Sequence, residues 1–256
     1  MRVEKRGTGE PEYSIVGGIH GDEPAGRKAI ERILAEDLRF ERPVQFVVAN
    51  EEALAEDKRF LDDDLNRVFP GDSGSDSHEK SLAVEILKQV KGTKVLDLHT
   101  THSYPYPFST FSSFDQKHWN LLSSAGVLNA VLFDDSSGSL HSAVDQGIIV
   151  EAGHQGTAQA VENAVGVVKN FLSSEGVLDL DYHRSEPNIF RYCETVEGDW
   201  KFTGENFRKI RAGEVFAEKD GEKLVAEEEF YPVLMSTNGY RDKLGFKAEK
   251  IEGLKD

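Results

Sequence analysis

The chain is poor in cysteine and in long apolar runs. Cys193 is its one cysteine, which excludes an internal disulfide and a zinc site built from several thiolates. We expect Cys193 to be a small core residue. No apolar run approaches the roughly 20 residues of a membrane-spanning helix, and the charged N-terminal stretch lacks the apolar middle of a signal peptide. These absences predict a cytoplasmic protein that does not bind membranes.

Positive charge is also scarce. The chain has 30 lysine and arginine residues against 46 aspartate and glutamate residues, which gives a formal net charge of −16. Nucleic acid and anionic membrane surfaces would repel such a chain, so we exclude both as partners. A small-molecule partner and a homo-oligomer are each compatible with this composition. An acidic protein that binds an anion must build a local cationic pocket, so arginines close to a candidate site are informative.

Apolar periodicity predicts an α/β fold. Apolar residues recur at helical spacing in several segments, and short β-branched runs lie between them. This alternation predicts a mostly parallel central sheet with helices on both faces. The expected helices are 25–38, 79–90, 117–125 and 157–172, and the expected strands include 44–48, 94–99, 127–133 and 147–150.

The pattern changes after about residue 176. Short runs typical of strands, separated by glycines, replace the longer helices. We therefore predict two domains, a larger α/β domain at 1–178 and a small β-rich domain at 179–256. The expected strands of the second domain are 188–194, 214–217, 223–226 and 231–235.

His20 and Glu23 form the first candidate site. They lie in the stretch YSIVGGIHGDEPA, residues 13–25, just after a predicted strand. Glycines allow a tight turn there, and Pro24 suits the first turn of a helix. An imidazole and a carboxylate three residues apart can bind one cation. The alternative is a turn whose polar residues are incidental.

His99 ends another apolar strand and is the best candidate for a third ligand. Two histidines and one glutamate hold zinc and leave a position for water, as hydrolase sites require. Such a site also needs a free carboxylate to carry protons, and Glu151 fits because it follows the strand at 147–150. Sites gather beyond the carboxyl ends of strands in an open α/β sheet, which predicts that these residues converge. His102 is a rival ligand, but a histidine in the loop after a strand need not face inward.

Four motifs occur in an order that resembles a known enzyme family. They are GGIHGDE, an R-x-x-x-x-D-L-N-R run, DLHTT and VEAG. Together they resemble the aspartoacylase/succinylglutamate desuccinylase family, whose catalytic domain is similar to zinc carboxypeptidases. The motifs span roughly residues 13–175, and a looser match, YPVLMSTNGY, covers 231–240.

The resemblance implies a role for each matching residue. One zinc ion per chain would be held by His20, Glu23 and His99. Glu151 would be the general base that activates water and then protonates the departing amine. Arg59 would polarise the scissile carbonyl and stabilise its oxyanion. The remaining residues would bind substrate or support the site: Asn66 and Arg67 at the α-carboxylate, Tyr240 reaching in from the second domain, and Asp64 and Asn50 nearby.

The chemistry of arginine agrees with these roles. A guanidinium can make two parallel hydrogen bonds to a carboxylate, which suits Arg67. A cation beside the carbonyl acts where negative charge develops, which suits Arg59. The alternative is that both arginines form surface ion pairs with the aspartates at 62–64.

One stretch departs from the family pattern. Aspartoacylases that favour acetylaspartate are expected to carry an arginine shortly before the base, which grips the side-chain carboxylate of the substrate. Here no arginine occurs between Arg67 and Arg184. His141 lies in the corresponding stretch, so either it substitutes for the arginine or the pocket accepts another acyl amino acid.

These observations predict a zinc-dependent deacylase. It would hydrolyse the amide bond of an N-acyl amino acid, of the N-acetylaspartate or N-succinylglutamate type, by metal-activated water. Two alternatives stay open: a non-catalytic protein that binds metal or acyl amino acid on the same scaffold, and a carboxypeptidase for small substrates. The base and Arg59 argue against the first, because binding alone requires neither. A second domain that closes over the pocket would exclude long peptides from the second.

Overall fold

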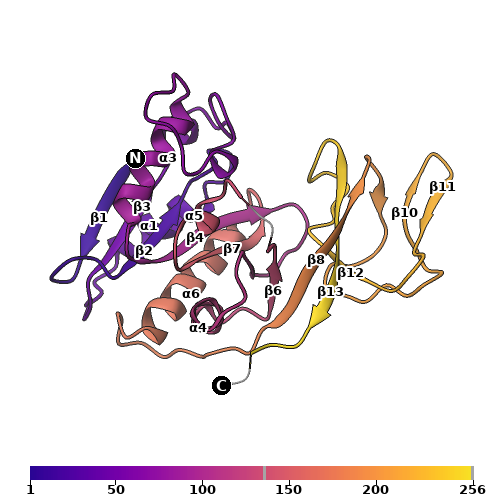
Figure 1. Cartoon of the computed structure of the whole chain (residues 1–256). Helices are drawn as coiled ribbons and strands as arrows, with labels where there is room; N and C mark the ends of the chain where they lie inside the picture. Colours follow the sequence, from indigo (N-terminus) through magenta and orange to yellow (C-terminus); the bar gives the residue numbers. More distant parts are fainter. Residues whose placement is uncertain (135–136, 255–256) are drawn as a thin grey trace.

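The computed structural model describes residues 1–134 and 137–254, and it is organised around one large mixed sheet (Figure 1). In the described chain this sheet has ten strands, in the order β1-β3-β2-β4-β7-β5-β6-β8-β13-β12. Strands β3, β2, β4 and β7 run parallel to one another, as do β5, β6 and β8. The bounds are Arg2–Arg6 (β1), Tyr13–Gly17 (β2), Val44–Val48 (β3), Lys94–Thr101 (β4), Phe108–Phe111 (β5), Asn129–Leu132 (β6), Gly147–His154 (β7), Asn188–Glu197 (β8), Tyr231–Val233 (β12) and Lys243–Ile251 (β13).

Helices cover both faces of this sheet, as the alternating pattern predicts (Figure 1). One face packs against α1, α4 and α6, and the opposite face packs against α3 and α5. Across the described residues, no helix is both long enough and apolar enough to cross a membrane. The helices are Ala25–Ala35 (α1), Glu51–Ala55 (α2), His78–Val90 (α3), Gln116–Ala125 (α4), Leu140–Ala143 (α5) and Ala158–Ser174 (α6), with a 3-10 turn at Leu65–Arg67 (η1).

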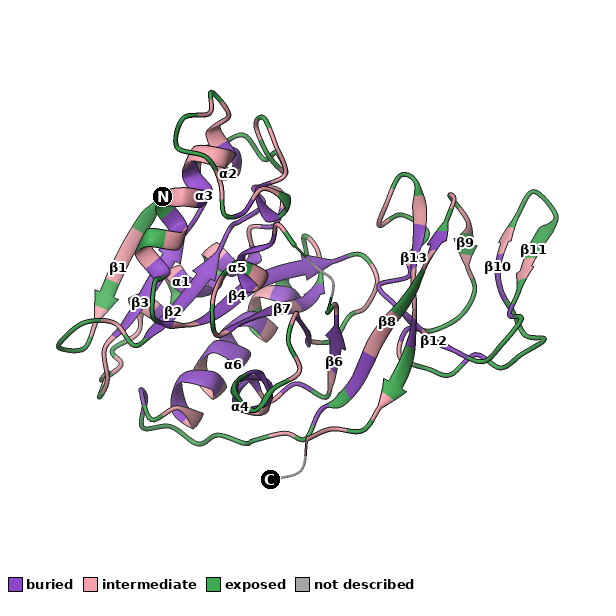
Figure 2. Cartoon of the chain, in the orientation of Figure 1, coloured by how far each residue is buried: buried purple, intermediate pink, exposed green. Residues whose placement is uncertain are grey.

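The central strands are apolar on both sides, which is why they are buried (Figure 2). Ile15 faces the core shared with α1 and α6, whereas its neighbour Val16 faces the core shared with α3. Side chains alternate across a strand, so consecutive apolar residues require a covered sheet on both faces. The predicted α/β class is therefore confirmed.

The C-terminal part is β-rich, as predicted. Strands β8, β13 and β12 extend the large sheet as antiparallel neighbours. A separate three-stranded antiparallel sheet projects beyond them (Figure 1). It consists of β9 (Lys201–Phe202), β10 (Val215–Lys219) and β11 (Glu222–Val225). It shares a small apolar core with residues of β8 and β13. The domain boundary between residues 178 and 179 stays a prediction.

One expectation about this region is wrong. Cys193 is exposed rather than part of the core. It lies where the pairing of β8 with β13 shifts register, since Lys247 pairs with Glu194 but Ala248 pairs with Tyr192. A bulge leaves the extra residue unpaired and resets which face each side chain takes, and local composition does not reveal this.

Candidate functional site

His20, Glu23 and His99 meet at the carboxyl end of the central strands. His20 and Glu23 lie in the turn between β2 and α1, and His99 lies near the end of the neighbouring strand β4. The turn depends on glycine: Gly18 has a φ of +73°, and a Cβ on Gly21 would lie 2.2 Å from the backbone of Ala53. All three site residues are less than 5% exposed, so their polar atoms face one another rather than solvent.

The ligand atoms of these residues converge on one point. His20 Nδ1 lies 2.9 Å from Glu23 Oε1, and His99 Nδ1 lies 3.3 Å from Glu23 Oε2. One atom from each residue falls within 4.8 Å of the others. Burial favours the neutral carboxyl, but the two histidines hold the pKa of Glu23 well below its ordinary value. A buried anion between two imidazole nitrogens is a donor set that fits zinc.

A carboxylate lies behind each histidine. His20 Nε2 is 3.0 Å from Asp64 Oδ1, and His99 Nε2 is 3.0 Å from Asp97 Oδ2. Such pairs fix the ring orientation and leave both Nδ1 atoms directed at Glu23. Burial opposes ionisation of Asp64, but the hydrogen bond with His20 and the charge of Arg59 keep its pKa well below the ordinary value. Asp64 therefore contacts both His20 and Arg59, and its supporting role stays a prediction.

Arg59 contacts the same cluster from a loop. Its Nη1 donates to Glu23 Oε1 at 3.0 Å, and its Nε donates to Asp64 Oδ2 at 3.2 Å. The surface ion-pair alternative is therefore half correct for Arg59, because one partner is Asp64 but the other is the buried Glu23. Arg67 forms no salt bridge within the described part of the chain; its Nη1 donates to the backbone carbonyl of Asn66 at 2.7 Å.

Glu79 of α3 holds the loop that carries Arg59 and Arg67. Its carboxylate is fully buried and accepts hydrogen bonds from the backbone N–H groups of residues 61, 62 and 63. It also accepts one from the Asn50 side chain, at 3.0 Å. Asn50 therefore supports the loop through its hydrogen bond to Glu79, and it does not line the cavity over the site. Sequence reasoning missed Glu79 because an acidic residue in the first turn of a helix is ordinarily exposed.

Glu151 lies beside the cluster without belonging to it. It pairs in register with His99 on the adjacent parallel strands β7 and β4. Its Oε2 is buried and has no hydrogen-bond partner in the part of the chain that the structure describes. Burial raises the pKa of Glu151 to about 7, and Glu23 adds to this rise while His99 opposes it. A carboxylate poised near neutrality can both accept and release a proton.

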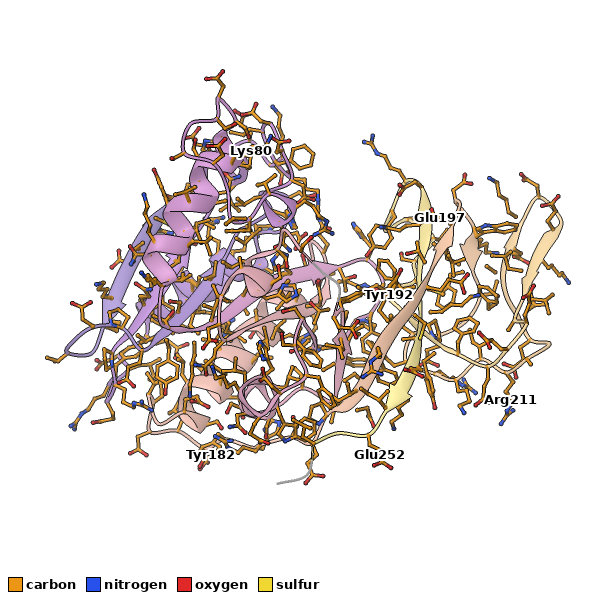
Figure 3. All side chains as sticks on the ribbon, in the orientation of Figure 1. Lys80, Tyr182, Tyr192, Glu197, Arg211 and Glu252 are labelled. Atoms are coloured by element: carbon orange, nitrogen blue, oxygen red, sulfur yellow. The ribbon has the colours of Figure 1, made fainter. Side chains whose placement is uncertain are left out.

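A cavity of about 700 Å³ opens over these residues. One side comes from the loops after β2 and β4, and the other comes from residues 234–246 near β13. Asn66, Arg67 and Tyr240 line it, as does Tyr192 of β8, which Figure 3 labels. Burial raises the pKa of Tyr240 above its ordinary value, so its phenol stays protonated and can donate a hydrogen bond.

Nine of the ten residues to which the family resemblance gives a role line this cavity, all except Asn50. The cavity also contains His102 and His141, which the sequence left open as candidates, and residues that the sequence did not single out, among them Phe133 and Lys243. These come from parts of the chain whose local sequence is ordinary for a loop or strand. Their shared position becomes visible once the sheet is assembled.

Comparison with known proteins agrees with this geometry. The family model for the succinylglutamate desuccinylase/aspartoacylase catalytic domain matches residues 10–173. The chain belongs to this family. The matched segment contains the His20, Glu23 and His99 cluster together with Glu151, so the resemblance carried by the four motifs is confirmed.

Relatives in the family are distant but match over most of the chain. A probable aspartoacylase of Trichodesmium erythraeum is 25% identical, over 90% of this chain and 93% of its own length. A succinylglutamate desuccinylase of Shewanella amazonensis is 22% identical, over 87% of this chain and 77% of its own length. The aspartoacylase and the succinylglutamate desuccinylase thus have similar sequence identity to this chain, and neither comparison identifies the substrate.

Solved structures of similar fold cover nearly the whole chain. The succinylglutamate desuccinylase/aspartoacylase of Rhodobacter sphaeroides has a TM-score of 0.76 at 18% identity, over 99% of this chain and 89% of that one. Murine aminoacylase 3 has a TM-score of 0.75 at 21% identity, over 95% and 97%. The likeness includes the C-terminal strands. The family is one of N-acyl amino acid amidohydrolases, and the buried triad of this chain is a candidate metal site typical of the zinc enzymes in the family.

Proposed function

We propose that this protein is a zinc-dependent deacylase that hydrolyses the amide bond of an N-acyl amino acid. The observation that carries the proposal is the arrangement at the ends of β2, β4 and β7. There, a convergent donor set lies next to an unpaired carboxyl group whose pKa is about 7, in one cavity. This combination suits hydrolysis, whereas a binding protein would need no such base.

His20, Glu23 and His99 would hold one zinc ion per chain. Zinc bound there would polarise the scissile carbonyl and lower the pKa of water, which is the chemistry such sites supply. The paired Asp64 and Asp97 keep both imidazole rings oriented for this role.

Glu151 is the proton carrier in this proposal. As a carboxylate it accepts a proton from the attacking water, and as a carboxylic acid it gives that proton to the nitrogen of the departing amine. The two steps require a pKa near the working pH, which burial supplies. Its position in register with His99, outside the ligand set, supports a role beside the reacting carbonyl.

Arg59 stabilises the oxyanion that forms as the amide is attacked. It is held by Glu23 and Asp64 through Nη1 and Nε, which leaves other N–H groups of the guanidinium for the substrate. Because it is fixed before the reaction, it need not reorganise when charge develops.

Asn66, Arg67 and Tyr240 bind the amino-acid half of the substrate. Arg67 is exposed to the cavity and free of carboxylate partners among the described residues, so its guanidinium can receive the α-carboxylate. The protonated Tyr240 donates a hydrogen bond from the opposite wall. Residues 234–246 narrow the cavity from the C-terminal side, which favours small acyl amino acids over long peptides.

Metal analysis and an activity screen test the proposal together. Purified protein should contain one zinc per chain and release free amine from at least some members of an acetyl- and succinyl-amino-acid panel. In His20→Ala and in His99→Ala, both the zinc content and the activity should fall to background, because two remaining ligands hold zinc weakly. The exposed His183→Ala is the matched control and should keep both. Full zinc occupancy in either ligand variant would remove that residue from the set.

A further inference from the structure

The side chain of Asn206 is buried between two segments of the chain and bonded to both. Asn206 lies between β9 and β10, outside every motif of the sequence, and is 5% exposed. Its Nδ2 donates to the Ser103 carbonyl at 2.9 Å and to the Met235 carbonyl at 2.8 Å. Its Oδ1 accepts a hydrogen bond from the Met235 N–H group at 2.9 Å. One amide group thus joins backbone that is far apart along the chain.

Both of the joined segments line the cavity of the candidate site. Ser103 follows β4, the strand that carries His99, and it lines the cavity from the side of the candidate metal ligands. The other segment is residues 234–242, which connect β12 to β13 and bring Tyr240 into the cavity (Figure 1). Asn206 itself is not among the described residues that line the cavity. It therefore lies behind the junction of the two walls.

Other contacts place the connection at residues 234–242 in the same position. Ser236 Oγ donates to the His102 carbonyl at 3.1 Å. Gly245 of β13 packs so closely on Met235 that a Cβ there would lie 2.5 Å from the Met235 Cα. The connection is therefore held from one side by β13 and from the other by the loop after β4.

The backbone beside these hydrogen bonds is strained at two positions. Phe207 has a φ of +66° and Leu234 a φ of +53°, a region that residues other than glycine rarely adopt. The Phe207 ring packs edge-on against the rings of Tyr104 and Phe108, with centroids 5.0 and 5.1 Å away. Such conformations persist where the surrounding contacts fix them, and they gather at functional sites. The strain indicates that the assembled cavity, rather than local preference, sets the position of Asn206.

We propose that Asn206 is a positioning residue of the active site. By holding residues 234–242 against the loop after β4, it fixes how far Tyr240 lies from the metal side of the cavity. The inference rests on the function proposed above, in which Tyr240 donates a hydrogen bond to the substrate. Asn206 should therefore change substrate binding through Tyr240 and leave the zinc content unchanged.

Steady-state kinetics on Asn206→Ala test the inference. KM should rise by about 3- to 10-fold, the contribution of one hydrogen bond to the substrate, while the zinc content stays at one per chain. The value of kcat should stay within about twofold, because the lost interaction is present before and during reaction. Asn206→Asp has the same shape but cannot donate to the two carbonyls. It should also raise KM, and it serves if the alanine variant does not fold.

A double-mutant cycle separates positioning from a general effect on the fold. In a Tyr240→Phe background, Asn206→Ala should lower kcat/KM by about twofold or less, because the interaction that Asn206 serves is already absent. Residues that act independently would instead give effects that multiply.

Asn170→Ala is the matched control. Asn170 Nδ2 donates to the carbonyls of Ser124 and His183 at 2.9 and 3.0 Å, and its Oδ1 accepts from the His183 N–H group at 2.9 Å. This pattern repeats that of Asn206 at residues that do not line the cavity. Asn170→Ala should therefore leave KM and kcat unchanged.

Hydrogen exchange gives a readout that does not need activity. In Asn206→Ala, exchange should become faster within residues 234–242 and stay unchanged in α1 and α6. If the wild type hydrolyses acyl amino acids but Asn206→Ala leaves KM unchanged, loses zinc or multiplies with Tyr240→Phe, the inference is wrong and the function stands. If exchange rises within residues 234–242 alone but the wild type hydrolyses no acyl amino acid, the positioning of this connection stands and the function is wrong. Unchanged exchange there overturns the inference.

Discussion

Strands β2, β4 and β7 belong to one sheet, yet the buried polar clusters at their two ends differ in how completely they are hydrogen-bonded. At the amino end, Glu175 accepts hydrogen bonds from Lys94 at 2.6 Å and Ser124 at 2.6 Å, and from Tyr13 at 3.3 Å. The guanidinium of Arg42 donates to the Glu175 backbone carbonyl at 2.8 Å. Both oxygens of this carboxylate are paired, and the cluster does not line the cavity that contains the candidate site.

At the carboxyl end the pairing is incomplete. Glu151 has an unpaired oxygen, and both nitrogens of His141 are unpaired with respect to the described chain. Folding stability alone would favour filling these positions with paired or apolar groups. The difference teaches that a buried carboxylate is informative about function where it lacks partners, and about stability where it has them. The predictions below test this division.

The largest effect should come from Glu151→Gln. Turnover should fall by about 10²- to 10⁴-fold, because a positioned proton carrier contributes that much, while zinc content and thermal stability stay close to wild type. Steady-state kinetics with metal analysis and thermal unfolding measure all three. Near-normal turnover would exclude Glu151 as the base.

The pH dependence of turnover in the wild type also tests the role of Glu151. Glu151 accepts a proton only when ionised, so turnover should decline as the pH falls through its pKa. That pKa is about 7 without a metal, and a bound cation would shift it downward. If turnover instead declined at a pH already above about 7, a group other than Glu151 would cause the decline.

Arg59 and Arg67 should differ in which kinetic constant they change. Arg59→Ala should lower kcat by about 10²- to 10³-fold, because the oxyanion forms fully only during reaction. Arg67→Ala should mainly raise KM, because the α-carboxylate is held equally before and during reaction. A substrate with an α-amide should be poor for the wild type and little affected by Arg67→Ala. Equal hydrolysis of α-amide and free acid by the wild type would show that Arg67 binds no carboxylate.

Glu79→Gln should have an intermediate effect, because Glu79 acts on the site only through the loop at residues 61–63. Loss of the charge-assisted hydrogen bonds should lower kcat/KM by on the order of tenfold through displacement of Arg59 and Arg67. Glu85→Gln is the matched control, since Glu85 is exposed on the same helix. Unchanged kcat and KM in Glu79→Gln would mean that the loop keeps its position without Glu79.

The smallest effect on activity should come from Glu175→Gln, which should instead cost about 1–3 kcal/mol of the free energy of unfolding. Burial favours the neutral carboxyl, but Lys94 and Ser124 hold the pKa of Glu175 below its ordinary value. A lowered folded-state pKa means that this stability is present above the unfolded pKa of about 4.3 and is lost as the pH falls through the folded value.

Urea unfolding at several pH values tests this sign. The difference in the free energy of unfolding between wild type and Glu175→Gln should be largest at pH 7 and should become smaller at acidic pH. Glu162→Gln, which removes an exposed ion pair with Arg32, should leave the free energy of unfolding close to the wild-type value. A loss of catalysis in Glu175→Gln at unchanged stability would contradict the division between the two ends.

Several features of this protein follow from its sequence alone. The helices α1, α3 and α6 lie close to the predicted segments, because an amphipathic repeat is a local property of the chain. The convergence of the candidate metal ligands is also predictable, because His20 and Glu23 share one turn and His99 ends a recognisable strand. For these residues, local chemistry and strand order suffice.

Other features were decided only by the tertiary structure. Strand β13 has little apolar pattern of its own, and it forms because β8 and β12 supply partners on both sides. Glu79 is indistinguishable in sequence from a solvated helix residue until the loop at 61–63 folds over it. The sequence places His141 in the stretch that lacks the expected arginine, but only the folded chain shows that both of its ring nitrogens are buried without a partner among the described residues. Sequence patterns report which residues the chain can bury, whereas burial, pKa and pairing depend on partners that are distant along the chain.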